Sequence, residues 1–568
     1  MSPLSKSPAQ RAVGDDALPG GGSGNLRALS ELPLRFRVSS SLATLACFAG
    51  LAVVHTWPLV TAPATWCRND NADAALNEWA LAWVAHALRT GPLDLFNANI
   101  FHPERLTLAY SEHLIVQGAM GAPLTWAGAS PVLVYNIVWL LGLTLSGWAG
   151  CSVIRRWTGS GWAGLVGGTA MTFTSLTFTS TAHIQAMHTE FLPLALYAFD
   201  RVLEHRRVRD ALTLGAMAAL QMLCSGYLLV FTAFALVAAS VARLPEWTTA
   251  PGARRRACLL ALAGVLTVVI CLPFLVPYAR VRAEQGLVRS VAETAKFSAR
   301  PTDYLATVSR LHFDAWSHRF YPAIDTLFPG AMVLGLAAVG ARRWREPRVR
   351  SLAAIAAVGF VLSFGPTTPV YVWLYRWFPL LQGVRGASRF GFLVLFGLAG
   401  LAAFGLARLE SRLVGQGRPA AAAALGAFAF VAVNAEAFTA PLDFVAFPGV
   451  PNVYAILAKQ PDAVVAEFPF PPIERVHDNG AFVVNSTAHW RPLVNGYSGF
   501  ASPAYARRAE VLSGFPDDES WQLLRELHVS HIVMHVDRDP ALARRLQDLT
   551  ELTLVAANRD IRIYAIAR

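Results

Sequence analysis

Two aspartates stand at the start of one short segment, "RNDNADAALNEWALAWVAHAL" (residues 68–88). Asp70 and Asp73 come just before a run of residues whose apolar spacing predicts an amphipathic helix. A carboxylate beside a hydroxyl group can act as a general base and remove its proton. An aspartate here also suits a helix start, where it accepts hydrogen bonds from free N–H groups and complements the helix dipole. The sequence supports both interpretations, and either aspartate could be the base.

The predicted helix would hold Asp73 on a defined face. Asp73 and Asn77 are four residues apart, so they share one side of the helix. Leu76, Trp79 and Trp83 supply an apolar side, which we expect to lie in a membrane interface. That arrangement would keep the carboxylate at the membrane surface.

A second polar pair follows in "NANIFHPERLTLAYSEHLI" (97–115). Glu112 and His113 precede an apolar stretch, so we expect them near the same surface as Asp73. They could support the acid site or bind a cation. A role at a helix start is an equal alternative.

Polar groups also interrupt the apolar pattern in "TAHIQAMHTEFLPL" (181–194). Ionisable groups at membrane depth are costly and are functional by default. We expect His183, Gln185 and Glu190 to line a polar cavity and to contact substrate. A metal site would need its ligands on one face, and this spacing does not fix such a geometry.

Two arginines four residues apart occur in "LLQGVRGASRFGF" (380–392). If this segment is helical, the guanidinium groups of Arg385 and Arg389 face the same way, as a phosphate at headgroup level would require. Arginines at the end of a membrane helix also extend to the surface without binding a ligand.

An aromatic segment near the C-terminus, "STAHWRPLVNGYSGF" (486–500), combines ring faces with amide and guanidinium donors. Such groups suit sugar binding, which makes Trp490 and Arg491 candidate substrate contacts. An ordinary ordered loop packed on the rest of the protein is the alternative.

Long apolar runs must position all of these residues. The chain has 568 residues, of which 54% are hydrophobic and 15% charged, and its runs are long enough to cross a bilayer as helices. The formal net charge of +11 comes from short basic clusters between the runs. Such clusters are typical of cytoplasmic loops and do not indicate nucleic-acid binding. We therefore predict a polytopic α-helical membrane protein.

The basic clusters also predict an orientation. Residues 1–38, which include "PGGGSG", are expected to be a disordered cytoplasmic tail. Residues 39–444 are expected to form about eleven transmembrane helices. The predicted spans are 39–60, 131–154, 162–180, 188–201, 211–225, 227–243, 257–278, 328–341, 351–365, 388–407 and 419–440. The protein is then expected in a bacterial inner membrane. Two long loops, 61–130 and 279–327, and the C-terminal residues 445–568 would lie on the external side of that membrane.

Residues 445–568 differ in character from the membrane part. "DAVVAEFPF", "HVSHIVMHV" and "IRIYAIA" predict strands, and "SWQLLRELH" predicts an amphipathic helix, so we expect a small extracytoplasmic α/β domain. The glycines of "GSGWAGLVGG" (159–168) lack the Lys-Ser/Thr ending of a phosphate loop and predict close helix packing instead. The six cysteines show neither a disulfide framework nor metal-ligand spacing.

The segments "DAALNEWALAWVAHAL", "NIFHPERLTLAYSEH", "RGASRF" and "HWRPLVNGYSGF" resemble an uncharacterised bacterial membrane-protein group close to the GT-C superfamily. That superfamily comprises polyprenyl-phosphate-dependent glycosyltransferases. The resemblance implies inverting sugar transfer from a lipid phosphate, with Asp73 as the base and Asp70 as its competitor. The adjacent pair of acids usual in the superfamily is absent here.

The resemblance further implies a membrane lipid, a polyprenyl-phosphate sugar donor and a glycan, lipid or protein acceptor as partners. A divalent metal is one option that it does not fix. A transporter or flippase for lipid-linked glycans, or a non-catalytic assembly protein of the cell envelope, is the alternative function. No convincing internal repeat supports a transporter.

Overall fold

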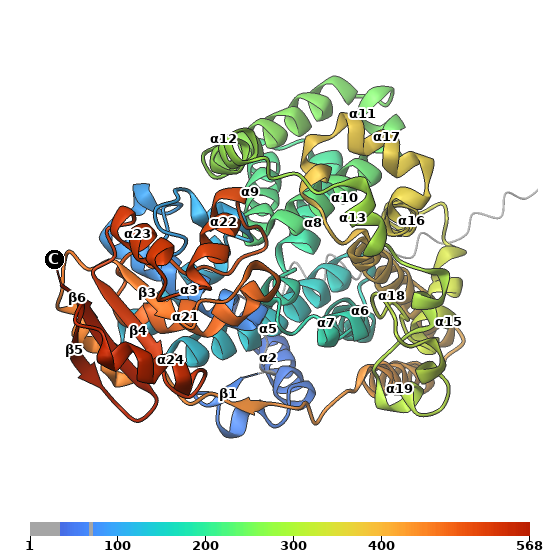
Figure 1. Cartoon of the computed structure of the whole chain (residues 1–568). Coiled ribbons are helices and arrows are strands. Elements are labelled where there is room, and N and C mark those ends of the chain that lie inside the picture. Colours follow the sequence, from blue (N-terminus) through green and yellow to red (C-terminus); the bar gives the residue numbers. More distant parts are fainter. Residues whose placement is uncertain (1–33, 68–71, 568) are drawn as a thin grey trace, which may run out of the picture. The chain divides into compact units, whose positions relative to one another are not determined.

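Helices dominate the computed structural model, which describes residues 34–67 and 72–567 (Figure 1). Most of the predicted N-terminal tail and Asp70 therefore lie outside the described residues. Residues 34–43, the first turns of α2, belong to one unit of the chain, and Thr44 onward forms another.

The helices before the C-terminal part are α2 (Leu34–His55), α3 (Ala72–Thr90), α4 (Ile115–Trp126), α5 (Pro131–Thr158), α6 (Gly161–Thr172), α7 (Ser175–Thr179), α8 (Phe191–His205), α9 (Val208–Cys224), α10 (Gly226–Ala242), α11 (Leu244–Thr248), α12 (Ala253–Gln285), α13 (Val291–Lys296), α14 (Arg310–Phe313), α15 (Ala331–Ala341), α16 (Pro347–Ser363), α17 (Pro369–Trp377), α18 (Gly391–Gly415) and α19 (Pro419–Ala437).

Four helical segments among the described residues are long and apolar enough to cross a membrane. They are α5, α12, α19 and the segment 387–415, which contains α18. Helices also occupy the other ranges predicted as spans, but they are shorter or less apolar. The count of about eleven spans stays a prediction.

Glycines bring several of these helices into backbone contact. A Cβ on Gly340 of α15 would lie 1.9 Å from the carbonyl oxygen of Leu401 on α18, and a Cβ on Gly405 would meet the Leu336 carbonyl oxygen equally closely. Gly168 approaches the backbone of α5 in the same way, with its Cβ position 2.5 Å from an oxygen. The prediction that the glycines of residues 159–168 serve close helix packing is confirmed for Gly164, Gly167 and Gly168, whereas a Cβ on Gly159 or Gly161 would meet nothing within 4 Å.

The C-terminal part contains a four-stranded sheet in the order β3-β4-β6-β5 (Figure 1). Strands β3 and β4 are parallel, and the other two pairs are antiparallel. The predicted strands and helix are present, and β5 is an additional strand. The elements are β3 (Val465–Phe468), β4 (His531–His535), β5 (Leu552–Ala557), β6 (Ile561–Ile566), α20 (Ala455–Ala458), α21 (Gly480–Asn485), α22 (Pro503–Leu512), α23 (Asp518–Glu526) and α24 (Pro540–Arg545). A short pair, β1 (Trp66–Cys67) with β2 (Val445–Ala446), joins the start of this part to the first loop.

Helix α3 is buried within the protein and does not lie in a membrane interface. Trp79 and Trp83 are 2% and 8% exposed, and Leu76 is buried as well. The indole N–H of Trp79 donates to Asn99 at 3.2 Å, and that of Trp83 donates to the carbonyl of Leu95 at 2.8 Å. The expected interfacial face is wrong because the folded loop and the C-terminal part cover it, which composition alone does not reveal.

One glutamate ties three parts of the chain together. The carboxylate of Glu104 accepts hydrogen bonds from Tyr110 at 2.5 Å and from Ser502, and it pairs with Arg508 of α22. The hydroxyl of Tyr110 also contacts Gln285 at the end of α12. The loop after α3 therefore holds both the C-terminal part and a candidate membrane helix.

We predict that Gly340→Ala destabilises the protein by about 1–3 kcal/mol, because the added methyl group overlaps the backbone of α18. The thermal unfolding temperature of the purified full chain measures this loss. Gly335→Ala is the matched control on the same helix, since a Cβ there meets nothing within 4 Å. Equal losses in both variants would contradict the close packing of α15 on α18.

Candidate active site

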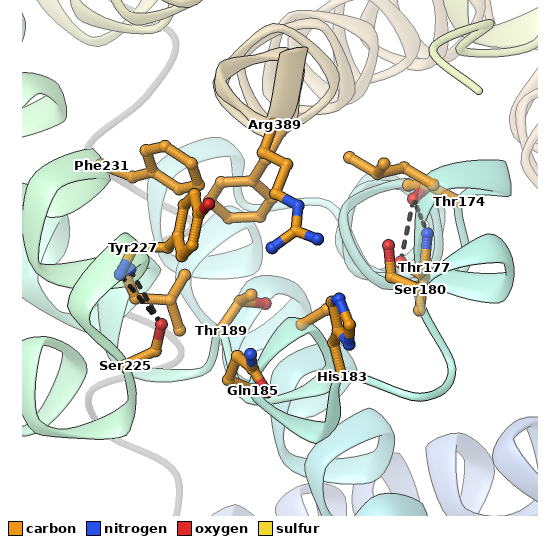
Figure 2. Close-up of a pocket in the computed structure, with 14 residues that line it drawn as sticks. Thr174, Thr177, Ser180, His183, Gln185, Thr189, Ser225, Tyr227, Phe231 and Arg389 are labelled. Atoms are coloured by element: carbon orange, nitrogen blue, oxygen red, sulfur yellow. Dashed lines mark hydrogen bonds between the residues drawn. The ribbon is translucent and has the colours of Figure 1, made fainter. Parts of the chain in front are cut away.

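A partly open cavity lies between α7, the loop that follows it, the start of α10 and the start of α18 (Figure 2), and its volume is about 560 Å³ when the open solvent at its mouth is included. One part of its wall is apolar, and the other part is polar. The apolar part is formed by Leu176, Leu228, Phe231 and Phe392, and the polar part by Thr174, Thr177, Ser180, His183, Gln185, Thr189 and Arg389. Such a cavity suits a ligand with one apolar and one charged or hydroxylated end.

A break in the chain supplies the polar wall. The span predicted for 162–180 is two helices, because α6 ends at Thr172 and Thr174 caps a new helix by accepting from the Thr177 N–H at 3.1 Å. Neighbouring elements then fix the loop after α7. Tyr135 donates to the carbonyl of Thr181 at 2.8 Å, and Asn77 of α3 donates to that of Ala182 at 2.6 Å.

Arg389 brings a positive charge into this cavity. Its guanidinium lies over the ring of Tyr227, 4.8 Å from the ring centre, and points toward the polar wall (Figure 2). Among residues 34–67 and 72–567, no carboxylate oxygen lies within 4.0 Å of it. A cation–π contact offsets only part of the cost of removing such a charge from water. The arrangement favours binding of an anion.

Two carboxylates lie near Arg389 without pairing to it. Burial raises the pKa of Asp325, which accepts a hydrogen bond from Ser388, and the Arg389 charge offsets part of that rise. Burial likewise raises the pKa of Glu112, and its carboxylate accepts from the Gly226 N–H at 2.6 Å at the start of α10. Glu112 therefore holds the helix that carries Tyr227.

Asp73 lies in the first turn of α3 and is held by the C-terminal part of the chain. The hydroxyl of Tyr497 donates to its Oδ1 at 2.5 Å, and the Nε2 of His183 is 4.0 Å from its Oδ2. Burial, followed by the charge of Arg389, lowers the pKa of His183 to about 4. The imidazole of His183 is thus neutral at pH 7, so its contact with Asp73 is not an ion pair. The Asp73 carboxylate is partly exposed.

The two arginines do not share a helix face. The backbone at 384–386 is not helical, and only a short 3-10 turn, Ala387–Phe390, precedes α18. Arg385 lies over Phe297, 5.1 Å from the ring centre, and its backbone N–H donates to the Tyr227 hydroxyl at 3.2 Å. Only Arg389 lines the cavity, although the charge of Arg385 also lowers the pKa of His183.

Gln185 is the other predicted residue in the cavity wall. Its side chain is buried, and within the described part of the chain its Oε1 has no hydrogen-bond partner. The Nδ1 of His183 lacks a partner in the same sense. Unpaired buried polar atoms are costly, so a ligand with hydroxyl groups would gain from contacts with both.

The remaining predicted residues lie elsewhere. Glu190 is buried in a closed network with His188 at 3.1 Å and Ser146 at 3.2 Å, outside the cavity wall. His113 is buried beside Tyr278, and burial lowers its pKa to about 4.

Trp490 and Arg491 hold local structure in the C-terminal part. Trp490 stacks on His86 of α3 with ring centres 4.4 Å apart. The guanidinium of Arg491 donates to the carbonyl groups of Leu457 and Ala458 at the end of α20, at 3.2 and 2.5 Å. Both therefore fasten the segment that leads to Tyr497.

Sequence reasoning missed Tyr227, Asp325 and Tyr497. Tyr497 belongs to the aromatic segment 486–500, but it is 424 positions from Asp73, so no local spacing connects them. Among the residues searched, no group of three or more His, Cys, Asp or Glu side chains is placed to hold a metal ion.

No protein-family model matches the chain, and no curated protein matches it in sequence. Among solved structures, it is similar to the Archaeoglobus fulgidus oligosaccharyltransferase that was crystallised tethered to an acceptor peptide with the NVT sequon. The identity is 14%, the match covers 88% of this chain and 69% of that chain, and the TM-score is 0.48. A likeness of this size leaves the activity to be inferred from the site itself.

We predict that lowering the pH from 7 to 5 destabilises the protein. His113 and His183 stay neutral in the folded state down to about pH 4, whereas the unfolded chain binds their protons near pH 6.5. At these two sites the unfolded state therefore binds more protons in this window, and their contribution to the free energy of unfolding falls as the pH falls. Thermal unfolding of the purified full chain at both pH values measures the loss.

His113→Gln should reduce this pH-dependent loss by about 1.4 kcal/mol for each pH unit between 6.5 and about 4, because it removes one of these buried histidines. His318→Gln is the control, since His318 is exposed, and it should lose as much stability as the unmodified protein. A pH dependence unaltered by His113→Gln would contradict the assignment.

Proposed function

We propose that this protein is a membrane glycosyltransferase that moves a sugar from a polyprenyl-phosphate donor to a hydroxyl acceptor at the external membrane face. The class of reaction is the one implied by the resemblance of its sequence segments to the GT-C superfamily. The observation that carries the proposal is the Arg389 guanidinium, which lines a half-apolar cavity and has no carboxylate within 4.0 Å in the described chain.

The phosphate of the donor and its isoprenoid chain would contact different parts of this cavity. The phosphate would lie against Arg389, because a guanidinium binds phosphate oxygens with charge-assisted hydrogen bonds. The first isoprene units would pack on Leu228, Phe231 and Phe392. The sugar hydroxyls would reach Gln185 and His183, whose buried polar atoms lack partners in the described chain.

Asp73 is the base in this proposal. The acceptor hydroxyl gives its proton to Asp73 as its oxygen forms a bond to the anomeric carbon, and the bond from that carbon to the lipid-phosphate oxygen breaks. The leaving phosphate gains negative charge, which Arg389 stabilises. The Tyr497 hydrogen bond at 2.5 Å orients the carboxylate, and neutral His183 does not compete for it as an ion pair.

The proposal includes a membrane location and an orientation for the chain. The four helices suited to span a membrane would sit in a bacterial inner membrane, with the N-terminus in the cytoplasm and the C-terminal part outside. The acceptor is a glycan, a lipid or a protein. A transporter of the same lipid-linked glycan would also need Arg389, but it would need no base beside the bound sugar.

We predict that Asp73→Asn lowers sugar transfer at least 10²-fold, because general-base catalysis contributes about 10²–10⁴-fold. The full chain in lipid vesicles is incubated with radiolabelled polyprenyl-phosphate sugars, and release of sugar from the lipid is counted. Tyr497→Phe should lower kcat about tenfold with little change in KM, since it only frees the carboxylate to move.

Asp94→Asn is the matched control, since Asp94 is an exposed acid in the same external loop and should leave transfer unchanged. Normal transfer by Asp73→Asn would overturn the assignment of the base. Binding of a donor without release of sugar, equal in all variants, would favour the transport or assembly role.

A further inference from the structure

Helix α17 (Pro369–Trp377) carries an apolar face that nothing in the described chain covers. Val370, Trp373 and Trp377 are three and four residues apart, so they lie along one side of the helix. Trp373 and Trp377 are 60% and 74% exposed. We call these three residues the α17 outer face. Two tryptophans this exposed on one short helix are unusual for a surface in contact with water.

The opposite side of α17 is anchored in the protein. Tyr371 is fully buried, and the Tyr375 hydroxyl donates to the carbonyl of Arg289 at 2.6 Å. The side chain of Gln382 donates to the Tyr375 carbonyl at 2.8 Å, and the ring of Phe378 packs on Phe234 of α10. These contacts keep the α17 outer face directed away from the protein.

A second apolar surface continues toward this face. Helix α12 exposes a strip along one side, formed by Val265, Val268, Val269, Leu272 and Val276. It is one of the four helices suited to span a membrane, and lipid would cover this strip. Beyond the strip, the guanidinium of Arg282 contacts the carbonyl of Pro379 and the side chain of Gln382, directly after α17. The α17 outer face thus lies next to the outer end of a membrane helix.

Tryptophan is enriched where a bilayer meets water, and an arginine near that boundary extends its charged group into the water. The indole ring packs among the acyl chains, and its N–H and the guanidinium stay among the headgroups. Helix α17 offers this combination, because Arg376 is exposed between its two tryptophans. Its short length and amphipathic pattern suit a helix that lies in the surface and does not cross it.

We propose that the α17 outer face inserts into the boundary between headgroups and acyl chains of the outer leaflet. The proposal rests on the membrane setting given under the proposed function. Its consequence is positional, because the chain runs from α17 through residues 379–383 to Arg385 and Arg389 within a few residues. Lipid contact at Trp373 and Trp377 holds these arginines at the height of a lipid phosphate.

The test places one fluorescent NBD label on the full chain in vesicles of phosphatidylcholine and phosphatidylglycerol. The background replaces only the three cysteines that are not buried, as Cys47→Ala, Cys67→Ser and Cys258→Ala. The probe site is Trp377→Cys. Val268→Cys on α12 is the reference for a residue in the bilayer, and Leu554→Cys on β5 is the reference for a residue in water.

Each labelled variant is quenched by lipids with a nitroxide near the headgroup or deep in the acyl chain, and by iodide in water. We expect the label at residue 377 to be quenched by the shallow nitroxide at least threefold more than the label at residue 554. We expect iodide to quench it several-fold less. The label at residue 268 should respond most to the deep nitroxide.

Three other outcomes overturn the proposal. Iodide quenching at 377 equal to that at 554 would place the α17 outer face in water. Protection from both lipid and aqueous quenchers would mean that protein covers it. If the label at 268 also fails to respond to lipid quenchers, the membrane setting itself is contradicted, which separates that failure from failure at α17 alone.

Discussion

Docking of the C-terminal sheet and its helices on α3 is the constraint on which the site depends. The buried residues of α3, of the loop after it and of strands β3 and β4 form one apolar core. Helix α21 packs against α3 so closely that a Cβ on Gly480 would lie 3.1 Å from Ala72. Glu104 adds a polar tie through Arg508 and Ser502. Only with this docking does Tyr497 reach Asp73.

The electrostatics of the cavity follow from how its charges are distributed. Asp325 and Glu112 are occupied by Ser388 and by the backbone of α10, so neither neutralises Arg389 directly. Burial and the arginine charge keep His183 neutral. The result is a positive charge in the cavity wall, at Arg389, and a carboxylate oriented by Tyr497, at Asp73, next to the cavity residue His183. A donor with a phosphate leaving group and an acceptor hydroxyl matches this pair of charges.

Local patterns predicted the elements better than they predicted the site. Helical periodicity located α3 and the apolar helices, and strand patterns located β3, β4 and β6, because each of these signals is carried by neighbouring residues. The apolar face of α3 was misplaced in a membrane interface, since an amphipathic pattern does not say whether lipid or protein covers it.

Local sequence patterns also identified the site residues better than they predicted the contacts between them. Asp73, His183, Gln185 and Arg389 were named from their chemistry. The last three line the cavity, and Asp73 lies 4.0 Å from His183. Arg385 was expected on the same helix face as Arg389, but Gly386 and the 3-10 turn after it change the backbone direction. Tyr497 could not be connected to Asp73, because their contact depends on tertiary packing between distant segments.

The measurement that tests the central claim most directly is a structure of the full chain with a polyprenyl phosphate bound in lipid. The account predicts the phosphate in the cavity, with its oxygens about 3 Å from the Arg389 guanidinium. The first isoprene units should lie against Phe231 and Phe392. A lipid phosphate bound at another place, with the cavity walls closed on themselves, would contradict the account.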